Sequence, residues 1–177
     1  MAKSFKSLLP SAYAPSIYGY DFQKAYDAGK RVILFDIDNT LVPHGAPADE
    51  RAKEFFASLK KMGFSLCAVS NNREPRVKLF CDAAGVPYVY KAGKPKKDGY
   101  LKGVRMFGYD PSEALFFGDQ IFTDIWGANR AGIDSVLVKP IDLSSDEIQI
   151  RLKRHLEKSV VRSFFREKGL AFYDHFH

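Results

Sequence analysis

Short apolar runs alternate with amphipathic segments through the middle of the chain. Five runs rich in strand-forming residues lie at residues 31–36, 64–70, 87–90, 114–119 and 135–139. The apolar positions in each run are continuous, which is typical of strands that are covered on both faces. They therefore predict a parallel sheet that is buried between helices.

Four segments with helical spacing of apolar residues follow these runs. They span residues 48–62, 75–84, 98–107 and 122–131. The first has the apolar spacing of one helical face, at Ala52, Phe55, Phe56, Leu59 and Met62. Asp49 can cap the start of this helix and Gly63 can end it. Alternating strands and helices with short connections predict an α/β fold, a Rossmann-like three-layer sandwich around a central parallel sheet.

The composition favours a single globular domain over residues 1–177, with a core at about 30–140 and an amphipathic extension at each end. The chain has 177 residues, of which 46% are hydrophobic and 27% charged. Its two cysteines, Cys67 and Cys81, form no CxxC pair, which argues against a disulfide scaffold or a zinc finger. Without an evident membrane span or secretory signal, the sequence predicts a cytoplasmic protein. Its net charge of +6 implies an anionic partner.

Polar side chains with catalytic potential collect directly after the predicted strands. They are Asp36, Asp38, Ser70, Lys94, Asp119 and Asp124. Because the carboxyl ends of parallel strands meet at one edge of a sheet, we expect these residues to lie together. Four carboxylates around one lysine repel one another unless a cation lies among them, and an oxygen-only ligand set selects a hard ion such as Mg²⁺. A surface turn is the weaker interpretation of Asp36 and Asp38, because hydrophobic residues flank the pair.

The order of these motifs resembles that of the haloacid dehalogenase superfamily of phosphotransferases. The DxDxT/V motif lies at Asp36–Val42, the serine motif at Ser70, the lysine motif at Lys94-Pro95 and the GDx₄D motif around Asp119–Asp124. The resemblance covers roughly residues 30–140 and implies a Mg²⁺-dependent phosphatase.

Three catalytic roles are implied by this resemblance. Asp36 is expected to be the nucleophile that forms an aspartyl-phosphate. Asp38 is expected to protonate the leaving group and then activate water. Lys94 is expected to neutralise Asp36 and the phosphoryl group.

The resemblance also implies a set of binding residues. Ser70, the N–H of Asn71 and Thr40 are expected to contact phosphate, together with Lys94. Asp119 is expected to bind Mg²⁺ directly, with Asp36 and the backbone carbonyl of Asp38 as further ligands. Asp124 is expected either to bind the ion or to orient Lys94.

The spacing of the motifs leaves no room for a sizeable cap domain. One predicted helix and one predicted strand fill the segment between Thr40 and Ser70, and the same is true between Ser70 and Lys94. An open site favours phosphate on a large molecule or at a surface, although small metabolites are not excluded.

The two ends of the chain are amphipathic. Aromatic residues are frequent in residues 5–26, and in residues 147–166 Leu152, Leu156, Val160 and Phe164 recur every four positions among basic side chains. This pattern is compatible with packing on the sheet, with peripheral contact at an anionic membrane, or with dimerisation.

The whole chain is similar to the YqeG family, small uncapped members of the superfamily in its subfamily IIIA. The likeness rests on LLPSAYAPSIYGYDF, DIDNTLVPH, VSNN, AGKPKKDG and GDQIFTDIWGANRAG. Because relatives in eukaryotic organelles are phosphatidylglycerophosphate phosphatases, the resemblance implies a lipid-phosphate substrate. A soluble nucleotide or sugar-phosphate phosphatase is the first alternative. A non-catalytic RNA- or ribosome-binding protein is the second, disfavoured because clustered carboxylates repel nucleic acid.

Overall fold

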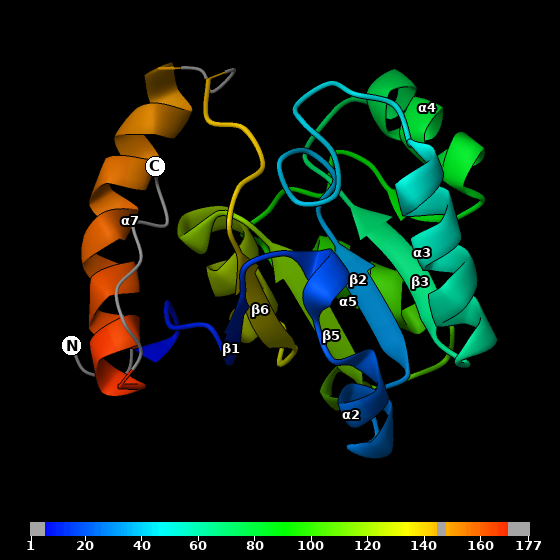
Figure 1. Ribbon diagram of the computed structural model, residues 1–177, viewed down its shortest axis with the longest axis horizontal. Coiled ribbons are helices and arrows are strands. Elements are labelled where there is room, and N and C mark those ends of the chain that lie inside the picture. Colours follow the sequence, from blue (N-terminus) through cyan, green and yellow to red (C-terminus); the bar gives the residue numbers. More distant parts are fainter. Residues whose placement is uncertain (1–5, 145–147, 170–177) are drawn as a thin grey trace.

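A six-stranded parallel sheet forms the centre of the molecule (Figure 1). The computed structural model describes residues 6–144 and 148–169. The strands are β1 (Ala12–Ala14), β2 (Val32–Phe35), β3 (Ser65–Val69), β4 (Tyr88–Val89), β5 (Ala114–Gly118) and β6 (Asp134–Val138). Their order across the sheet is β1-β6-β5-β2-β3-β4, and every neighbouring pair is parallel.

The five predicted strands are confirmed, and β1 was not predicted. This strand has only three residues, Ala-Tyr-Ala, and it pairs in parallel with β6 at the edge of the sheet, with Ala12 opposite Val136. Its pairing depends on a partner more than a hundred positions away. No local run of apolar residues marks it in the sequence.

Helices cover both faces of the sheet and produce the predicted three layers. The helical elements are η1 (Ile17–Gly19), α2 (Phe22–Asp27), α3 (Glu50–Lys61), α4 (Glu74–Ala84), α5 (Asp98–Arg105), η2 (Pro111–Glu113), η3 (Ile121–Ile125), α6 (Trp126–Arg130) and α7 (Ile148–Glu167). One apolar cluster joins α2, α3 and α4 to the sheet, and a second joins α5 and α6 to its opposite face. The predicted helix over residues 122–131 begins instead with the π-helical turn η3.

The local signals in the sequence explain the position of α3. The side chain of Asp49 accepts a hydrogen bond from the Ala52 N–H at 2.8 Å, as a helix cap does. Ala52, Phe56 and Leu59 are buried against the sheet. Gly63 follows the helix with φ of +99°, a conformation that favours glycine.

The N-terminal extension packs on the core, which confirms one of the three alternatives for its described residues. Ile17 and Phe22 are buried, and the Tyr18 hydroxyl donates to the Leu41 carbonyl at 2.8 Å. The ring centroids of Tyr20 and Phe117 lie 5.0 Å apart, edge to face.

Helix α7 follows the predicted apolar stripe only in its second half. Val160 and Phe164 are buried in a cluster with Ile121 and Ile125, but Leu152 and Leu156 are 64% and 59% exposed. Both leucines point outward because the buried face of this part of the helix is formed by Arg154 and Glu157, which are described below. In the described parts of the chain, none of the helices has the length and hydropathy needed to cross a bilayer.

Neither segment between the motifs contains a cap domain. The residues from Thr40 to Ser70 form α3 and β3, and those from Ser70 to Lys94 form α4 and β4. Both segments are fully described, so neither of them places a further domain over the carboxyl ends of the strands.

Candidate active site

The carboxyl ends of the strands place the predicted residues at one edge of the sheet. Asp36 directly follows β2, Ser70 follows β3 and Asp119 follows β5. The Asp36 N–H donates to the Phe117 carbonyl at 2.9 Å, which continues the ladder between β2 and β5. This pairing brings Asp36 and Asp119 to the same level of the sheet.

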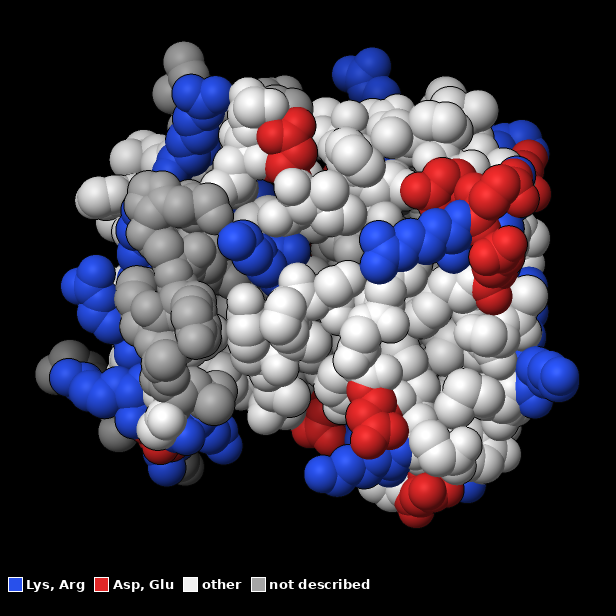
Figure 2. All heavy atoms as spheres, viewed as in Figure 1, with Lys and Arg blue, Asp and Glu red and all other residues white. Residues whose placement is uncertain are grey.

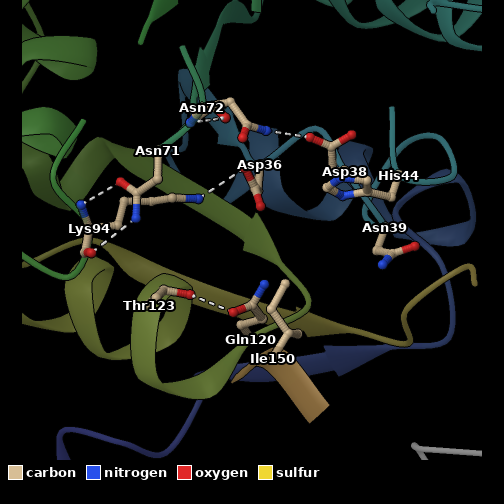
Figure 3. Close-up of a pocket in the computed structure, with 11 residues that line it drawn as sticks. Asp36, Asp38, Asn39, His44, Asn71, Asn72, Lys94, Gln120, Thr123 and Ile150 are labelled. Atoms are coloured by element: carbon tan, nitrogen blue, oxygen red, sulfur yellow. Dashed lines mark hydrogen bonds and ion pairs between the residues drawn. The ribbon is translucent and has the colours of Figure 1, made fainter. Parts of the chain in front are cut away.

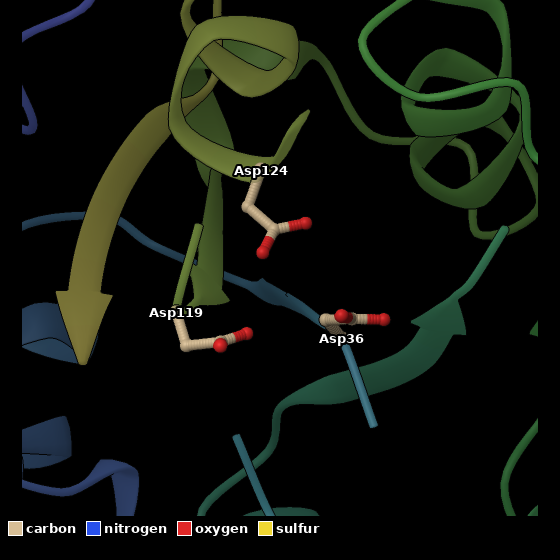
Figure 4. A group of neighbouring side chains, drawn as sticks. All are labelled: Asp36, Asp119 and Asp124. Carbon is tan, nitrogen blue, oxygen red and sulfur yellow. The ribbon is translucent and has the colours of Figure 1, made fainter. Parts of the chain in front are cut away.

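Three carboxylates meet at this edge (Figure 4). Asp36, Asp119 and Asp124 each offer an oxygen, and these oxygens all lie within 4.8 Å of one another. Asp119 and Asp124 are fully buried, and Asp36 is 8% exposed. Burial raises the pKa of all three carboxyl groups, that of Asp36 to about 6. Such a cluster of buried negative charge requires cations close to it.

Lys94 supplies one of these cations. Its Nζ lies 2.7 Å from Asp124 Oδ1 and 3.0 Å from Asp36 Oδ1. Burial alone would lower the pKa of Lys94, but the carboxylates of Asp124 and Asp36 raise it above its ordinary value. Lys94 is therefore an ammonium ion at neutral pH.

The backbone of Lys94 is held by the side chain of Asn71 (Figure 3). The Asn71 amide donates to the Lys94 carbonyl at 3.1 Å and accepts from the Lys94 N–H at 2.7 Å. The neighbouring Lys91, Lys96 and Lys97 are exposed. Of these four lysines, only Lys94 points into the carboxylate cluster.

Asp38 is fixed by three donors on the other wall of the site. Its carboxylate accepts from Arg76 Nη2 at 2.7 Å, Asn72 Nδ2 at 2.6 Å and the Gly45 N–H at 2.8 Å. Arg76 lies in the first turns of α4 and was not predicted as a site residue. Its contact with Asp38 spans 38 positions, and no local pattern indicates it.

A cavity of about 190 Å³ opens over these residues. Ten of its eleven lining residues have polar side chains, and the set is Asp36, Asp38, Asn39, His44, Ser70, Asn71, Asn72, Lys94, Gln120, Thr123 and Ile150. Figure 3 shows these side chains around one hollow, into which Asp36 and Lys94 point. The volume and lining suit a phosphoryl group better than an apolar ligand.

Three predicted site residues, Thr40, Asp119 and Asp124, lie behind this cavity instead of in its wall. Thr40 is buried, and its Oγ1 lies 3.5 Å from Asp119 Oδ1. Asp124 is also buried, and it contacts the ammonium group of Lys94, which lines the cavity. The predicted contact of Thr40 with phosphate stays a prediction.

The turn η3 returns Asp124 beneath the end of β5. The Gln120 N–H donates to Asp124 Oδ2 at 3.1 Å. A Cβ added at Gly118 would overlap the Asp124 side chain. Glycine at 118 therefore permits Asp124 to approach the strand.

Helix α7 contributes two buried ionisable residues that were not predicted as part of the site. Arg154 Nη2 lies 2.5 Å from Asp119 Oδ2, and its Nη1 donates to the Asp119 carbonyl at 3.3 Å. One helical turn later, Glu157 Oε1 accepts from the Phe122 N–H at 2.9 Å. The sequence shows Arg154 as one of several basic residues on an amphipathic helix. Arg154 is distinguished only by its position. It lies three residues before Glu157, on the helix face that also buries Val161 and Phe164.

The oxygens that remain uncommitted fit a hard divalent cation. Within the described residues, no hydrogen-bond donor contacts Asp36 Oδ2, and Asp119 Oδ1 has only the long contact with Thr40. Both oxygens of Asp124 are occupied, by Lys94 and by the Gln120 N–H. An oxygen donor set without sulfur or imidazole is the kind that Mg²⁺ prefers.

Comparisons with known proteins agree with this geometry. The family model described as haloacid dehalogenase-like hydrolase matches residues 45–132. The Bacillus subtilis (strain 168) protein named "Probable phosphatase YqeG" is 36% identical over 165 residues, which cover 93% of this chain and 95% of that protein. The Arabidopsis thaliana protein named "Phosphatidylglycerophosphate phosphatase 1, chloroplastic/mitochondrial" is 26% identical over 191 residues, which cover 99% of this chain and 53% of that protein. This chain therefore spans about half the length of the Arabidopsis protein.

A solved structure shares the fold. The haloacid dehalogenase phosphatase from Thermococcus onnurineus superposes with a TM-score of 0.50 at 17% identity, covering 73% of this chain and 97% of that one. The similarity to the Bacillus protein extends over nearly all of both chains, and the family model agrees with it. The chain therefore belongs to the haloacid dehalogenase-like hydrolases, as a phosphatase of that type.

Proposed function

We propose that the chain hydrolyses a phosphomonoester in two steps, with Asp36 as the nucleophile. The contact of Asp36 with Lys94 at 3.0 Å, beside the uncommitted oxygen of Asp119, carries this proposal. The Asp36 carboxylate attacks phosphorus, the bond from phosphorus to the alcohol oxygen breaks, and the leaving oxygen takes a proton. Water then attacks the phosphorus of the aspartyl-phosphate, which releases inorganic phosphate and restores the carboxylate.

We assign to Asp38 the transfer of the proton in both steps. Its carboxyl group lines the same cavity as Asp36, and Arg76, Asn72 and the Gly45 N–H restrict its orientation. In the first step Asp38 donates a proton to the leaving oxygen, and in the second it accepts one from water. A rigid acid–base group of this kind favours hydrolysis of the intermediate over its accumulation.

The remaining residues bind charge. Lys94 offsets the negative charge of Asp36 and of the phosphoryl oxygens, while Asp124 holds its ammonium group in place. Ser70 and the Asn71 N–H are assigned to the phosphate oxygens. Asp36, Asp119 and the Asp38 carbonyl are assigned to Mg²⁺, which when bound lowers the repulsion between carboxylate and phosphate dianion.

We propose a lipid phosphate, phosphatidylglycerophosphate, as the favoured substrate. The edge of the sheet carries no cap in the described segments, so a phosphate at a membrane surface could reach it. Lys and Arg side chains lie along the edge of the molecule that α7 forms (Figure 2), including the exposed Arg151, Arg162 and Arg166. The exposed Leu152 and Leu156 lie on the same helix. The name of the Arabidopsis relative supports the same choice.

A soluble nucleotide or sugar phosphate is the second candidate. The cavity volume of about 190 Å³ and the polar side chains in its lining favour a small hydrophilic group. Such a substrate would need no membrane contact. The buried carboxylates argue against the third interpretation, an RNA-binding protein, because they repel nucleic-acid phosphates.

A substrate panel separates the two candidates. The purified protein would be assayed with phosphatidylglycerophosphate in anionic micelles and with soluble nucleotides and sugar phosphates, each with Mg²⁺ and with a chelator. The lipid proposal predicts the highest kcat/KM for the micellar substrate and loss of activity with chelator. Higher kcat/KM for a soluble phosphoester would contradict the lipid assignment, and no hydrolysis of any substrate would contradict the proposed reaction.

A further inference from the structure

We propose that Arg154 determines which divalent ion the site accepts, because it leaves Asp119 only one oxygen to offer. This inference rests on the proposed function, and concerns the metal preference of the same site. Arg154 belongs to α7, which lies outside residues 45–132, the segment that matches the family model. It reaches the carboxylate cluster from the C-terminal helix and not from the end of a strand.

The guanidinium of Arg154 holds Asp119 at two points. Its Nη2 contacts Asp119 Oδ2 at 2.5 Å, and its Nη1 contacts the Asp119 backbone carbonyl at 3.3 Å. Arg154 is 5% exposed and Asp119 is fully buried, so water does not compete for this contact. Two bonds from one planar group fix both the position and the rotation of the carboxylate.

Each carboxylate of the cluster has at least one oxygen in contact with a donor, which reduces the number of oxygens that can bind a cation. Lys94 occupies Asp36 Oδ1 at 3.0 Å and Asp124 Oδ1 at 2.7 Å. The Gln120 N–H occupies Asp124 Oδ2 at 3.1 Å. Arg154 occupies one oxygen of Asp119 in the same way, so neither Asp36 nor Asp119 can bind a cation through both carboxylate oxygens without losing an ion pair.

This restriction discriminates between the two common hard cations. Mg²⁺ demands a small octahedral shell, keeps several waters and takes one oxygen from each of one or two carboxylates. Ca²⁺ takes six to eight oxygens and often binds carboxylates through both. A carboxylate that can bind a cation through only one oxygen therefore suits Mg²⁺, and it lacks a second ligand atom that Ca²⁺ would use.

The fold allows Arg154 to be changed without releasing α7. Two sets of contacts that hold α7 do not involve Arg154: Glu157 accepts from the Phe122 N–H at 2.9 Å, and Val161 and Phe164 belong to one apolar cluster with Ile121. Methionine at position 154 keeps an unbranched, flexible side chain and removes the donors of arginine. Arg166, exposed on the same helix, provides the matched control.

The test is the binding of each ion alone, measured by calorimetry on metal-free protein without substrate. Arg154→Met is expected to shift the ratio of Ca²⁺ to Mg²⁺ affinity toward Ca²⁺ by at least about tenfold, because the second Asp119 oxygen becomes available. Arg166→Met is expected to keep the wild-type ratio. Arg154→Lys retains a charge but cannot form both bonds, so it is expected to shift the ratio about threefold in the same direction.

The variants and the assay keep this inference separate from the reaction. Circular dichroism checks that each variant is folded, and if Arg154→Met is not, Arg154→Lys decides. An unchanged ratio in a folded Arg154 variant overturns the inference. An active wild-type phosphatase without the shift contradicts this inference alone, whereas a shift in a protein that hydrolyses no phosphoester contradicts the proposed function alone.

Discussion

Lys94 reaches across the end of strand β3 to place its Nζ 3.0 Å from Asp36 Oδ1. The strand order puts β3 between β2, which precedes Asp36, and β4, which precedes Lys94. The Asn71 side chain, in the loop after β3, holds the backbone of Lys94 and so bridges this gap. The nucleophile and its counter-charge therefore depend on three neighbouring strands being in register.

Replacement of Lys94 separates its electrostatic role in folding from its role in catalysis. Lys94→Met leaves Asp36 and Asp124 buried without a cation, which is expected to lower the free energy of unfolding by about 3–5 kcal/mol. Adding Asp124→Asn removes one of the two unpaired charges, so the double variant is expected to regain part of that stability. Both variants lack the ammonium group of Lys94, so both are expected to be inactive. Urea denaturation and kcat/KM measure the two effects, and recovery of activity in the double variant would contradict the role of Lys94.

Gly118 is predicted to be required for the position of Asp124. Gly118→Ala places a methyl group against the Asp124 side chain, which would displace the partner of Lys94. A displacement of about 1 Å at such a site can cost about 100-fold in kcat. Gly19→Ala is the control, because no atom lies within 4 Å of its added Cβ. Equal activity in the two variants would show that Asp124 needs no close approach to β5.

The buried Glu157 predicts a pH dependence of stability. Burial raises the pKa of Glu157 from 4.5 to about 8. Between these pH values the folded state keeps a proton that the unfolded state loses, so stability falls as pH rises. Glu157→Gln cannot lose this proton, and its unfolding free energy relative to wild type is expected to increase by roughly 1–3 kcal/mol between pH 5 and pH 8.

Chelator-treated protein is the sample for this comparison, with denaturation followed at both pH values. Burial also raises the pKa values of Asp36, Asp119 and Asp124. These three groups are present in both proteins, so the difference between the two pH profiles reports chiefly on Glu157. Glu167→Gln, on the exposed side of α7, is expected to leave the pH dependence unchanged. If the unfolding free energies of wild type and Glu157→Gln change equally with pH, Glu157 is not the group that keeps the proton in the folded state.

The sequence predicts the central sheet and the catalytic edge because both depend on local signals. The apolar run before Asp36 indicates a buried strand, and parallel strands necessarily bring their carboxyl ends together. Once the strands are known, Asp36, Ser70 and Asp119 must lie at one edge. The capping residue Asp49 and the turn at Gly63 follow from equally local chemistry.

The contacts that sequence reasoning missed join residues far apart in the chain. Arg76 and Asp38 are 38 positions apart, and Arg154 and Asp119 are 35 apart. A charged residue on a helix is usually solvated, so periodicity alone assigns Arg154 to the polar face. Leu152 shows the opposite error. The four-residue repeat predicts that Leu152 is buried, but the helix exposes it and buries Arg154 instead.

Trapping of the phosphorylated enzyme tests the central claim most directly. Asp38→Asn, which lacks the acid–base group, would be mixed with substrate and Mg²⁺, quenched in acid and digested for mass spectrometry. We predict a mass gain of one phosphoryl group on the peptide that contains Asp36, no such gain in the Asp36→Asn/Asp38→Asn double variant, and a loss of at least about 1,000-fold in kcat for Asp36→Asn alone. Near-normal turnover by Asp36→Asn, or a phosphoryl group on any other residue, would contradict the account.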